Sequence, residues 1–465
     1  MQFDLVINDG KIVNEESVFV ADIGIKDGKI HTVAKNIDPS SASKRINASN
    51  KYVLPGVIDV HTHLRDLGRS NWGTFESETR AALAGGVTTV LDMPNNIPPA
   101  IDIDSCKLRI DVGQKKTYIN LGFVAGAGIE NISEIPRIGA SGLVFAFKSF
   151  MRKPPGLERE KEFTGTLAED DGIFHAVAKQ VAKTNMPYLI HCESAQIVGF
   201  EANRLMIEGR NDLSAYEESK PQIIESLGVA RALEVSGVTE AKLHICHMSA
   251  ERSVIMTRWA KKQGRRITAE TCGNHVFFTI DQLARLGHYA KISPPLRKAS
   301  DIEALWEGLL DDTIDCIVSD HAPFGADDVD AGKNNIWQGT AGWPGIEVLL
   351  PQILSYVKKG LIDLNFVVRK MAINPAKHAG LYPAKGQIRP GSDADITIID
   401  PNLEWSVDID KLETMGKDTA FYYDKLRLTG KATATIVNGI VAMQDGNILT
   451  KPGSGKVILK KNLAA

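Results

Sequence analysis

The sequence lacks most features that would place its 465 residues outside ordinary globular proteins. Its five cysteines are widely spread and none forms a C-x-x-C pair, which favours reduced thiols in the cytoplasm over a disulfide framework. No apolar run reaches the roughly 18 residues of a transmembrane helix. The first ten residues, MQFDLVINDG, lack the charged and apolar regions of a signal peptide. A net charge of -3 without basic runs argues against nucleic acid or an anionic membrane as a partner.

Both ends of the chain are rich in short strand patterns. Asp-Gly occurs inside DGKI at residues 9–12 and 27–30, and Asn-Gly divides residues 434–443, ATIVNGIVAM; both dipeptides are hairpin signals. Residues 391–400, GSDADITIID, alternate and then become continuously apolar. We therefore expect residues 1–55 and 381–465 to form one small β-sandwich domain, with a different domain between them at residues 56–380.

Eight short apolar runs alternate with helical patterns, such as residues 74–86 and 223–237, in the middle of the chain. The runs cover residues 57–63, 87–93, 118–124, 142–148, 187–192, 242–247, 266–271 and 314–320. This alternation predicts an α/β fold with a parallel sheet, and eight units predict a closed (β/α)8, TIM-like barrel. The alternative, an open doubly wound sheet, predicts a glycine-rich phosphate loop after the first strand, which the sequence lacks.

Ionisable side chains gather where these runs end. His61 and His63 are two residues apart, so they point to the same side of a strand. The others are Lys148, His191, His247 and Asp320. His244 faces the other way from His247, and we assign it no metal role. Imidazole and carboxylate ligands suit Zn, and also Mn, Fe or Co. From spacing alone Lys148 is interpreted as a salt-bridging lysine, because an ammonium has no acceptor to offer a metal.

Two loops at the same strand ends are candidate lids or substrate walls. Residues 151–165 follow the fourth run and carry charges and prolines. Residues 322–345 follow the eighth run and form a long connection. Surface insertions without a role in the site are the alternative for both.

The motifs together resemble those of the amidohydrolase superfamily, and within it the cyclic amide hydrolases: allantoinases, hydantoinases and dihydropyrimidinases, and dihydroorotases. The matching stretches run in the family's order along essentially the whole chain: PGVIDVHTH, FKSF, LIHCES, HICHMS, AKISPPLR, VSDHAP and GSDADITIID. The resemblance implies that two divalent ions, zinc before manganese, cobalt or iron, are bound. The more buried ion would be held by His61, His63 and Asp320, and the other by His191 and His247. A carbamate formed on Lys148 from CO2 would bridge them.

The same resemblance implies a mechanism and a homo-oligomer, a dimer or tetramer. A hydroxide held between the two ions would attack the ring carbonyl of a small cyclic amide. Asp320 would take the hydroxide proton as general base and return it to the ring nitrogen as general acid. The backbone at Ser293, Ala341 and Gly342 would hold the amide edge of the ring.

Residues near the site combine the features of several subgroups. Residues 68–96, GRSNWGTFESETRAALAGGVTTVLDMPNN, look most like an allantoinase, and Trp72 within them is either a substrate contact or a packing residue. Arg65 and Asn95 match the dihydroorotase pattern, in which they clamp a substrate carboxylate. A salt bridge from Arg65 to Asp66 or a nearby loop acid is the structural alternative. Phe324 stands where dihydroorotases usually carry a histidine, and it matches hydantoinases instead.

The position five residues after Lys148 is usually a tyrosine in hydantoinases and dihydropyrimidinases, where it donates to the developing oxyanion. Here it is Lys153, preceded by Arg152. If the side chain of Arg152 or Lys153 pointed into the site, it would favour a negatively charged substrate. We interpret the two residues instead as solvated charges of the lid loop. We expect metal-dependent hydrolysis of a ring C–N bond, allantoinase- or hydantoinase-like, with dihydroorotase as the alternative. A non-catalytic structural relative is disfavoured, because all six ligand positions are kept.

Overall fold

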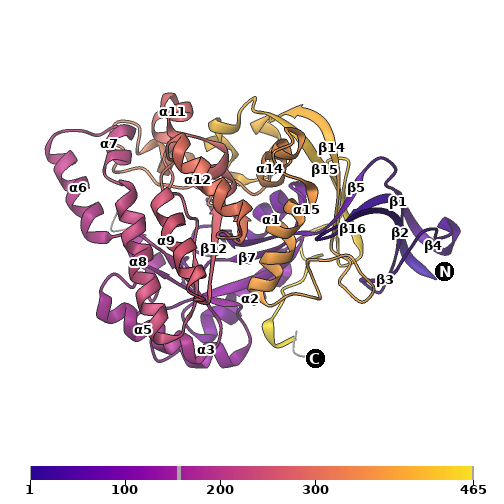
Figure 1. The fold of residues 1–465 in the computed structure, drawn as a ribbon, viewed down its shortest axis with the longest axis horizontal. Helices are drawn as coiled ribbons and strands as arrows, with labels where there is room; N and C mark the ends of the chain where they lie inside the picture. Colours follow the sequence, from indigo (N-terminus) through magenta and orange to yellow (C-terminus); the bar gives the residue numbers. More distant parts are fainter. Residues whose placement is uncertain (1, 154–158, 463–465) are drawn as a thin grey trace.

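The computed structural model describes residues 2–153 and 159–462. A barrel surrounded by helices lies beside a sheet that contains strands from both ends of the chain (Figure 1). The indigo amino-terminal strands and the yellow carboxy-terminal strands lie together on the side of the barrel away from helices α6 and α8. This arrangement confirms the predicted fold class.

Eight parallel strands form the barrel, and each overlaps one of the eight predicted runs. They are β6 Val57–Thr62, β7 Val87–Asp92, β8 Asn120–Gly126, β9 Ala146–Phe150, β10 Pro187–His191, β11 Lys242–Ile245, β12 Ile267–Cys272 and β13 Cys316–Val318. They pair in sequence order from β6 to β13, and a parallel bridge between Thr62 and His321 brings the first and last strands together. Their β-branched and apolar side chains are almost all buried, as expected for strands covered by helices on one face and packed inside a barrel on the other.

Helices follow the strands along the chain and cover the outside of the barrel (Figure 1). The predicted helical segments are α1 Phe75–Ala84 and α8 Gln222–Thr239. Thr74 caps α1 by accepting a hydrogen bond from the Ser77 backbone, the capping box that fixes where this helix begins. The other α-helices of the described residues are α2 Ile103–Lys116, α3 Ile135–Ser141, α4 Glu160–Phe163, α5 Asp171–Lys183, α6 Ala195–Ile207, α7 Leu213–Glu218, α9 Glu251–Lys262, α10 Gly273–Phe277, α11 Ile280–Leu283, α12 Ala299–Leu310, α13 Ala326–Asp330, α14 Leu349–Lys358, α15 Leu364–Val368 and α16 Asn374–Ala379.

The second sheet joins the two ends of the chain. Its strands are β1 Phe3–Val13, β2 Val18–Lys26, β3 Lys29–Ala34, β4 Ala42–Asn47, β5 Tyr52–Pro55, β14 Ile396–Ser406, β15 Arg427–Val437, β16 Ile440–Gln444 and β17 Asn447–Ile448. The junction is the antiparallel pair of β5 and β14, which places Pro55 opposite Ile396. One buried apolar cluster contains side chains from both terminal segments, including Ile7, Ile23, Ile396 and Ile436. The terminal segments therefore share a core.

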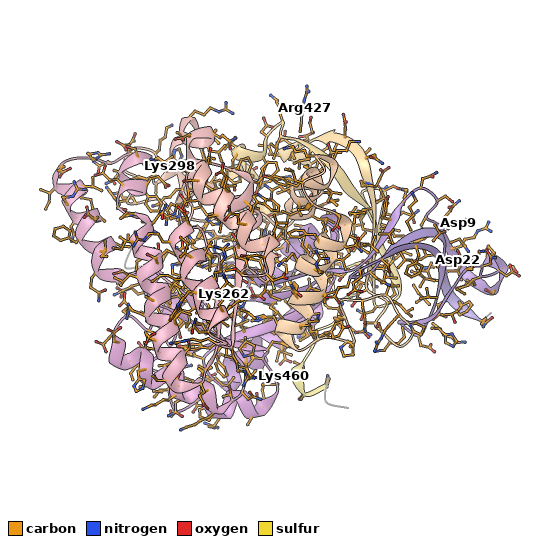
Figure 2. All side chains as sticks on the ribbon, in the orientation of Figure 1. Asp9, Asp22, Lys262, Lys298, Arg427 and Lys460 are labelled. Atoms are coloured by element: carbon orange, nitrogen blue, oxygen red, sulfur yellow. The ribbon has the colours of Figure 1, made fainter. Side chains whose placement is uncertain are left out.

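One predicted hairpin is wrong. Asp27-Gly28 does connect β2 to β3, but Asp9-Gly10 lies inside the single strand β1. The register against β2 shifts between Ile7 and Gly10, a β-bulge with Asp9 at φ 57°. The Asp9 backbone N–H donates to Asp22 Oδ1 at 2.8 Å, and both residues are labelled in Figure 2. Asp-Gly supplies positive φ in a bulge as readily as in a turn, so the dipeptide alone did not separate the two.

The carboxy-terminal segment also contacts the barrel directly. Met415 N–H donates to Glu78 Oε1 of α1 at 3.0 Å, and Tyr423 Oη donates to Asn274 Oδ1 at 2.7 Å. Further on, residues 456–458 bond with Leu121 of β8. The division into residues 1–55, 56–380 and 381–465 remains a prediction. In the part of the chain that the structure describes, no helix has the length and apolar character needed to cross a bilayer.

Candidate metal centre and substrate cavity

Three of the predicted ligands converge at one end of the barrel. His61 lies near the end of β6 and His63 just beyond it, and their ring centroids are 5.5 Å apart. Asp320 Oδ1 lies 3.5 Å from His61 Nε2 and 3.2 Å from His63 Nε2. All three side chains are buried. Both imidazole Nε2 atoms therefore lie near the same carboxylate oxygen of Asp320.

The other predicted histidines form a second pair next to the first. His191 ends β10, and His247 lies two residues beyond β11. His191 Nδ1 and His247 Nε2 are 2.9 Å apart, and the ring of His247 lies 5.2 Å from that of His61. Ligand atoms of His61, His247 and Asp320 all lie within 4.8 Å of one another. The predicted histidines and Asp320 therefore form one continuous cluster.

Lys148 lies beside this cluster, fully buried in β9. Its Nζ donates to Cys246 Sγ at 2.8 Å and lies 5.0 Å from the centre of the Phe150 ring. Among the described residues, no carboxylate lies within ion-pairing distance of this ammonium. The salt bridge predicted from spacing alone is therefore wrong, and Lys148 is a buried amine without a counter-charge.

Two carboxylates that were not predicted from the sequence contact the histidines on the ring nitrogen that does not face the other candidate ligands, and so orient the rings. Glu270 of β12 contacts His61 Nδ1 through one oxygen and His244 Nε2, at 3.0 Å, through the other. Glu193 Oε2 lies 2.7 Å from His191 Nε2. A carboxylate on one ring nitrogen fixes the tautomer and leaves the other nitrogen for a metal. His244 thus does not join the cluster, but it reaches the cluster through Glu270.

Replacing Glu270 with glutamine should weaken metal binding about 10- to 100-fold, the usual effect of removing a carboxylate that orients a ligand. The measurement is metal retained after dialysis against a graded chelator series. Glu234, an exposed partner of Arg265 on α8, offers the matched control Glu234→Gln. Equal retention by the Glu270→Gln variant and the unaltered chain would contradict the role assigned to Glu270.

The charges of the cluster suit a cation. Burial alone would lower the pKa of His61, but Glu270 and Asp320 stabilise positive charge there and raise it to about 10. Burial would raise the pKa of Asp320, but the surrounding histidines outweigh it, so the carboxyl stays ionised at neutral pH. The pKa of His63 falls to about 3, mainly through burial, so this ring is neutral and can offer a lone pair. The electrostatic potential from Glu270 and Asp320, which favours positive charge at His61, would also favour a bound metal ion.

Three of the site residues adopt backbone conformations with positive φ. These are Arg65 at 66°, His247 at 31° and Asp320 at 47°. Such conformations are uncommon for residues with a side chain and persist where the surroundings enforce them. The sequence predicts His247 and Asp320 at strand ends. They lie two residues beyond β11 and β13, where the turn directs each side chain over the barrel.

A cavity of about 660 Å³ opens above the cluster. Its walls include Ser293, Ala341 and Gly342, the predicted backbone anchors, and residues from both candidate lid loops. A Cβ on Gly342 would lie 2.7 Å from Phe324 Cε2, so glycine is required for the close approach of this loop. Residues 154–158 of the first lid loop lie outside the described residues. The cavity is large enough for a small heterocycle.

Arg65 and Asn95 both line the cavity. The Arg65 guanidinium lies 4.5 Å from the Phe324 ring, and its Nε donates to the Pro323 carbonyl at 3.2 Å. Asp66 pairs with Lys116 instead, at 2.8 Å. Within the described residues, Arg65 Nη1 and Asn95 Oδ1 are buried without hydrogen-bond partners. Neither atom is therefore committed to another group of the described chain.

Trp72 combines both alternatives considered for it. It lines the cavity, yet it is 2% exposed and packs against Phe324 at 4.9 Å between ring centroids. Its Nε1–H donates to Asp328 Oδ2 at 2.6 Å, which ties the first loop to the eighth.

The two lid cations differ in position. Lys153 pairs with Glu160, and its side chain is 46% exposed, as expected for a solvated charge. Arg152 instead lines the cavity, where its Nε donates to Glu193 Oε2 at 2.8 Å. The interpretation of both residues as solvated lid charges is therefore wrong for Arg152.

This chain belongs to the amidohydrolase family, whose model matches residues 52–441. Among curated proteins, it is 30% identical to an L-hydantoinase of Paenarthrobacter aurescens, over 100% of this chain and 99% of the relative. It is 32% identical to an allantoinase of Escherichia coli, over 99% of both chains.

Solved structures agree with the sequence relatives. An L-hydantoinase (dihydropyrimidinase) from Arthrobacter aurescens superposes with a TM-score of 0.93 at 29% identity, covering 98% of this chain and all of the other. A D-hydantoinase superposes with a TM-score of 0.91 at 28% identity, covering 98% of each chain. The resemblance stated from the motifs is thereby confirmed.

Proposed function

We propose that this protein hydrolyses a ring C–N bond of a cyclic amide or ureide, and that the substrate is allantoin, a hydantoin or a closely similar ring. The observation that carries the proposal is the cluster of His61, His63, His191, His247 and Asp320 at the floor of a cavity sized for a small ring. Relatives at full length bear the names L-hydantoinase and allantoinase, which supports the same substrate class.

Two divalent ions, zinc first among the candidates, fit the donors around the cavity. His61, His63 and Asp320 would hold one ion, and His191 and His247 would hold the other. When bound, such an ion pair supplies Lewis acidity that activates water and polarises a carbonyl. Lys148 fits as a bridging ligand once carbamylated by CO2, because its side chain is buried beside the cluster, no carboxylate of the described residues pairs with it, and a carbamate would offer two oxygens to the ions.

Asp320 is the residue that would move the proton. Its carboxylate lines the cavity and stays ionised at neutral pH, so it can accept the proton of the attacking water. It would then give this proton to the ring nitrogen as the C–N bond breaks. The backbones of Ser293, Ala341 and Gly342 would orient the ring from the opposite wall.

A dihydroorotase-like reaction on a ring with a carboxylate is the second candidate. Arg65 Nη1, which is buried without a hydrogen-bond partner among the described residues, favours it, and Asn95 lines the same cavity. Against it, Phe324 fills the space beside Arg65, where a further polar contact to a carboxylate would lie. Arg65 thus forms an incomplete anion clamp.

A panel of allantoin, hydantoin, dihydrouracil and dihydroorotate separates these candidates. Protein loaded with Zn, Mn or Co in the presence of bicarbonate is assayed for loss of the ring and gain of the open-chain ureido product. We expect kcat/KM for allantoin or hydantoin to exceed that for dihydroorotate. Faster hydrolysis of dihydroorotate would favour the second candidate, and inactivity on every ring with bound metal would contradict both.

Replacing Arg65 with alanine should affect acid and neutral rings differently. If Arg65 binds a substrate carboxylate, kcat/KM for dihydroorotate should fall about 100-fold, the order of a charge-assisted pair, with little change for hydantoin. Arg65→Lys, which keeps the charge but not the planar fork, should lose part of that activity. Equal losses on both rings would assign Arg65 to packing against Trp72 and Phe324.

Location and assembly belong to the same proposal. All five cysteines are free and buried, which supports a reducing compartment such as the cytoplasm. Exposed apolar side chains on α6 and α8, among them Phe200, Ile207 and Leu227, support a dimer or tetramer. Sedimentation equilibrium would measure the assembly state.

A further inference from the structure

One wall of the cavity carries a partly buried group of charged and polar side chains in addition to the six candidate ligands. We call Arg152, Glu193, Lys220 and Ser293 the Glu193 network. Glu193 Oε2 accepts from Arg152 Nε at 2.8 Å, and Glu193 Oε1 accepts from Lys220 Nζ at 2.8 Å. Lys220 Nζ also lies 2.7 Å from Ser293 Oγ. The network therefore connects His191, through Glu193, to the wall that contains Ser293.

The network holds more positive than negative charge. Two cations share one carboxylate, and that carboxylate also contacts His191. Lys220 is enclosed, with 2% of its side chain exposed, and burial lowers its pKa to about 8. Arg152 lines the cavity and has 14% of its side chain exposed. Of these two cations, Arg152 is the one that reaches the cavity.

The Arg152 guanidinium also has N–H donors that its contacts with the described residues do not use. A guanidinium carries five N–H groups. Within the described residues, Nε is directed to Glu193, Nη1 donates to the Lys153 carbonyl at 3.2 Å, and Nη2 makes a long contact of 3.5 Å to Ser293 Oγ. The remaining Nη hydrogens lie on the side chain that lines the cavity, next to the wall proposed to hold the ring.

On the premise of the proposed ring hydrolysis, we propose that Arg152 is a catalytic residue that donates from Nη to the substrate carbonyl oxygen as this oxygen becomes an anion. The water oxygen bonds to the carbonyl carbon, and the carbonyl electron pair moves to the oxygen facing Arg152. The pair then returns, the ring C–N bond breaks, and the nitrogen takes its proton from Asp320. Arg152 keeps its own protons, and Glu193 is the positioning residue that holds it.

A donor aimed at charge that develops in the transition state raises kcat more than it tightens substrate binding. Arg152→Gln should therefore lower kcat about 10²- to 10³-fold and change KM by less than about threefold. Arg152→Lys should lie between this variant and the unaltered chain. Lys153→Gln is the matched control, because it removes one charge from the neighbouring, solvent-exposed position, and its kinetics should match those of the unaltered chain.

A structural role for Arg152 would give different results. Guanidinium chloride added to Arg152→Ala should restore part of kcat if the missing group acts on the substrate, and metal content should equal that of the unaltered chain. No rescue, or lost metal with a matching loss of activity, would overturn the proposal. A loss of kcat as large in Lys153→Gln would also overturn it.

Binding of inorganic phosphate to zinc-loaded protein, measured by calorimetry, tests the same charge without turnover. Arg152→Gln should bind phosphate about tenfold more weakly, the order of one charge-assisted hydrogen bond. Equal affinities would overturn the role of Arg152. An unaltered chain that binds phosphate through Arg152 but hydrolyses none of the rings would contradict the proposed function and leave this anion contact standing, so the two failures are distinguishable.

Discussion

Lys148→Ala should reduce hydrolysis by roughly 10³-fold or more and lower the bound metal, because the two ions would lose their shared ligand. The variant also leaves a buried space beside Cys246 where the amine now lies. Acetate or propionate added to the variant should enter this space, supply two carboxylate oxygens and restore part of the activity. Metal analysis and turnover, with and without the added acid, measure both effects.

Two comparisons decide whether Lys148 acts as a carbamate. Lys262→Ala removes an exposed lysine at the end of α9, labelled in Figure 2, and should leave turnover unchanged. In the unaltered protein, labelled bicarbonate should give a carbamate carbon signal in NMR spectra, and exhaustive removal of CO2 should lower activity. Absence of both the signal and the rescue would mean that Lys148 is an ordinary buried amine.

Asp320→Asn should lower kcat about 10³-fold, within the range that positioned acid–base groups contribute. Asparagine keeps the shape of the side chain and one oxygen, but it cannot carry the proton from water to the ring nitrogen. Surroundings that favour the carboxylate hold the pKa of Asp320 below its usual range, so activity of the unaltered enzyme should decline only at acidic pH. The pH profile of the variant, measured where metal occupancy stays complete, should lack the part of that acidic limb that Asp320 contributes.

The matched control for this change is Asp171→Asn. Asp171 is an exposed aspartate that pairs with Arg231, away from the cavity, and its replacement should leave kcat and the pH profile unaltered. Circular dichroism and metal content of the Asp320→Asn protein separate lost chemistry from lost structure. An unchanged kcat at full metal occupancy would remove Asp320 from the mechanism.

The fold was predictable because its signal is local and repeated. Each barrel strand is a short, β-branched apolar run, and alternating helices leave few topologies open. The same locality explains the error at Asp9-Gly10: whether this dipeptide forms a turn or a bulge depends on the strands that pair with β1, one of which ends at Lys26 and another of which begins at Ala42.

The site was predictable only in part, for a similar reason. The shared side of His61 and His63 follows from strand geometry, but the charges behind them come from distant segments. In the sequence, nothing distinguishes Glu270 from another acidic residue in a strand. Its contact with the histidines arises only when β12 pairs with β11 in the fold. Arg152 and Lys153 are adjacent in a loop without a repeating pattern, so only the three-dimensional path of the loop separates the buried cation from the solvated one.

The pairing of β5 with β14 has a consequence for how the chain folds during synthesis. The amino-terminal strands β1 to β5 leave the ribosome first and pair among themselves, but β14, the second partner of β5, follows only after the entire barrel has been made. Until then β5 has an unpaired edge, which can pair with other chains. The barrel can form in the meantime from neighbouring segments, because short sequence separations favour rapid folding. Completion of the second sheet is thus expected to be the late step, and incomplete chains the species that aggregate.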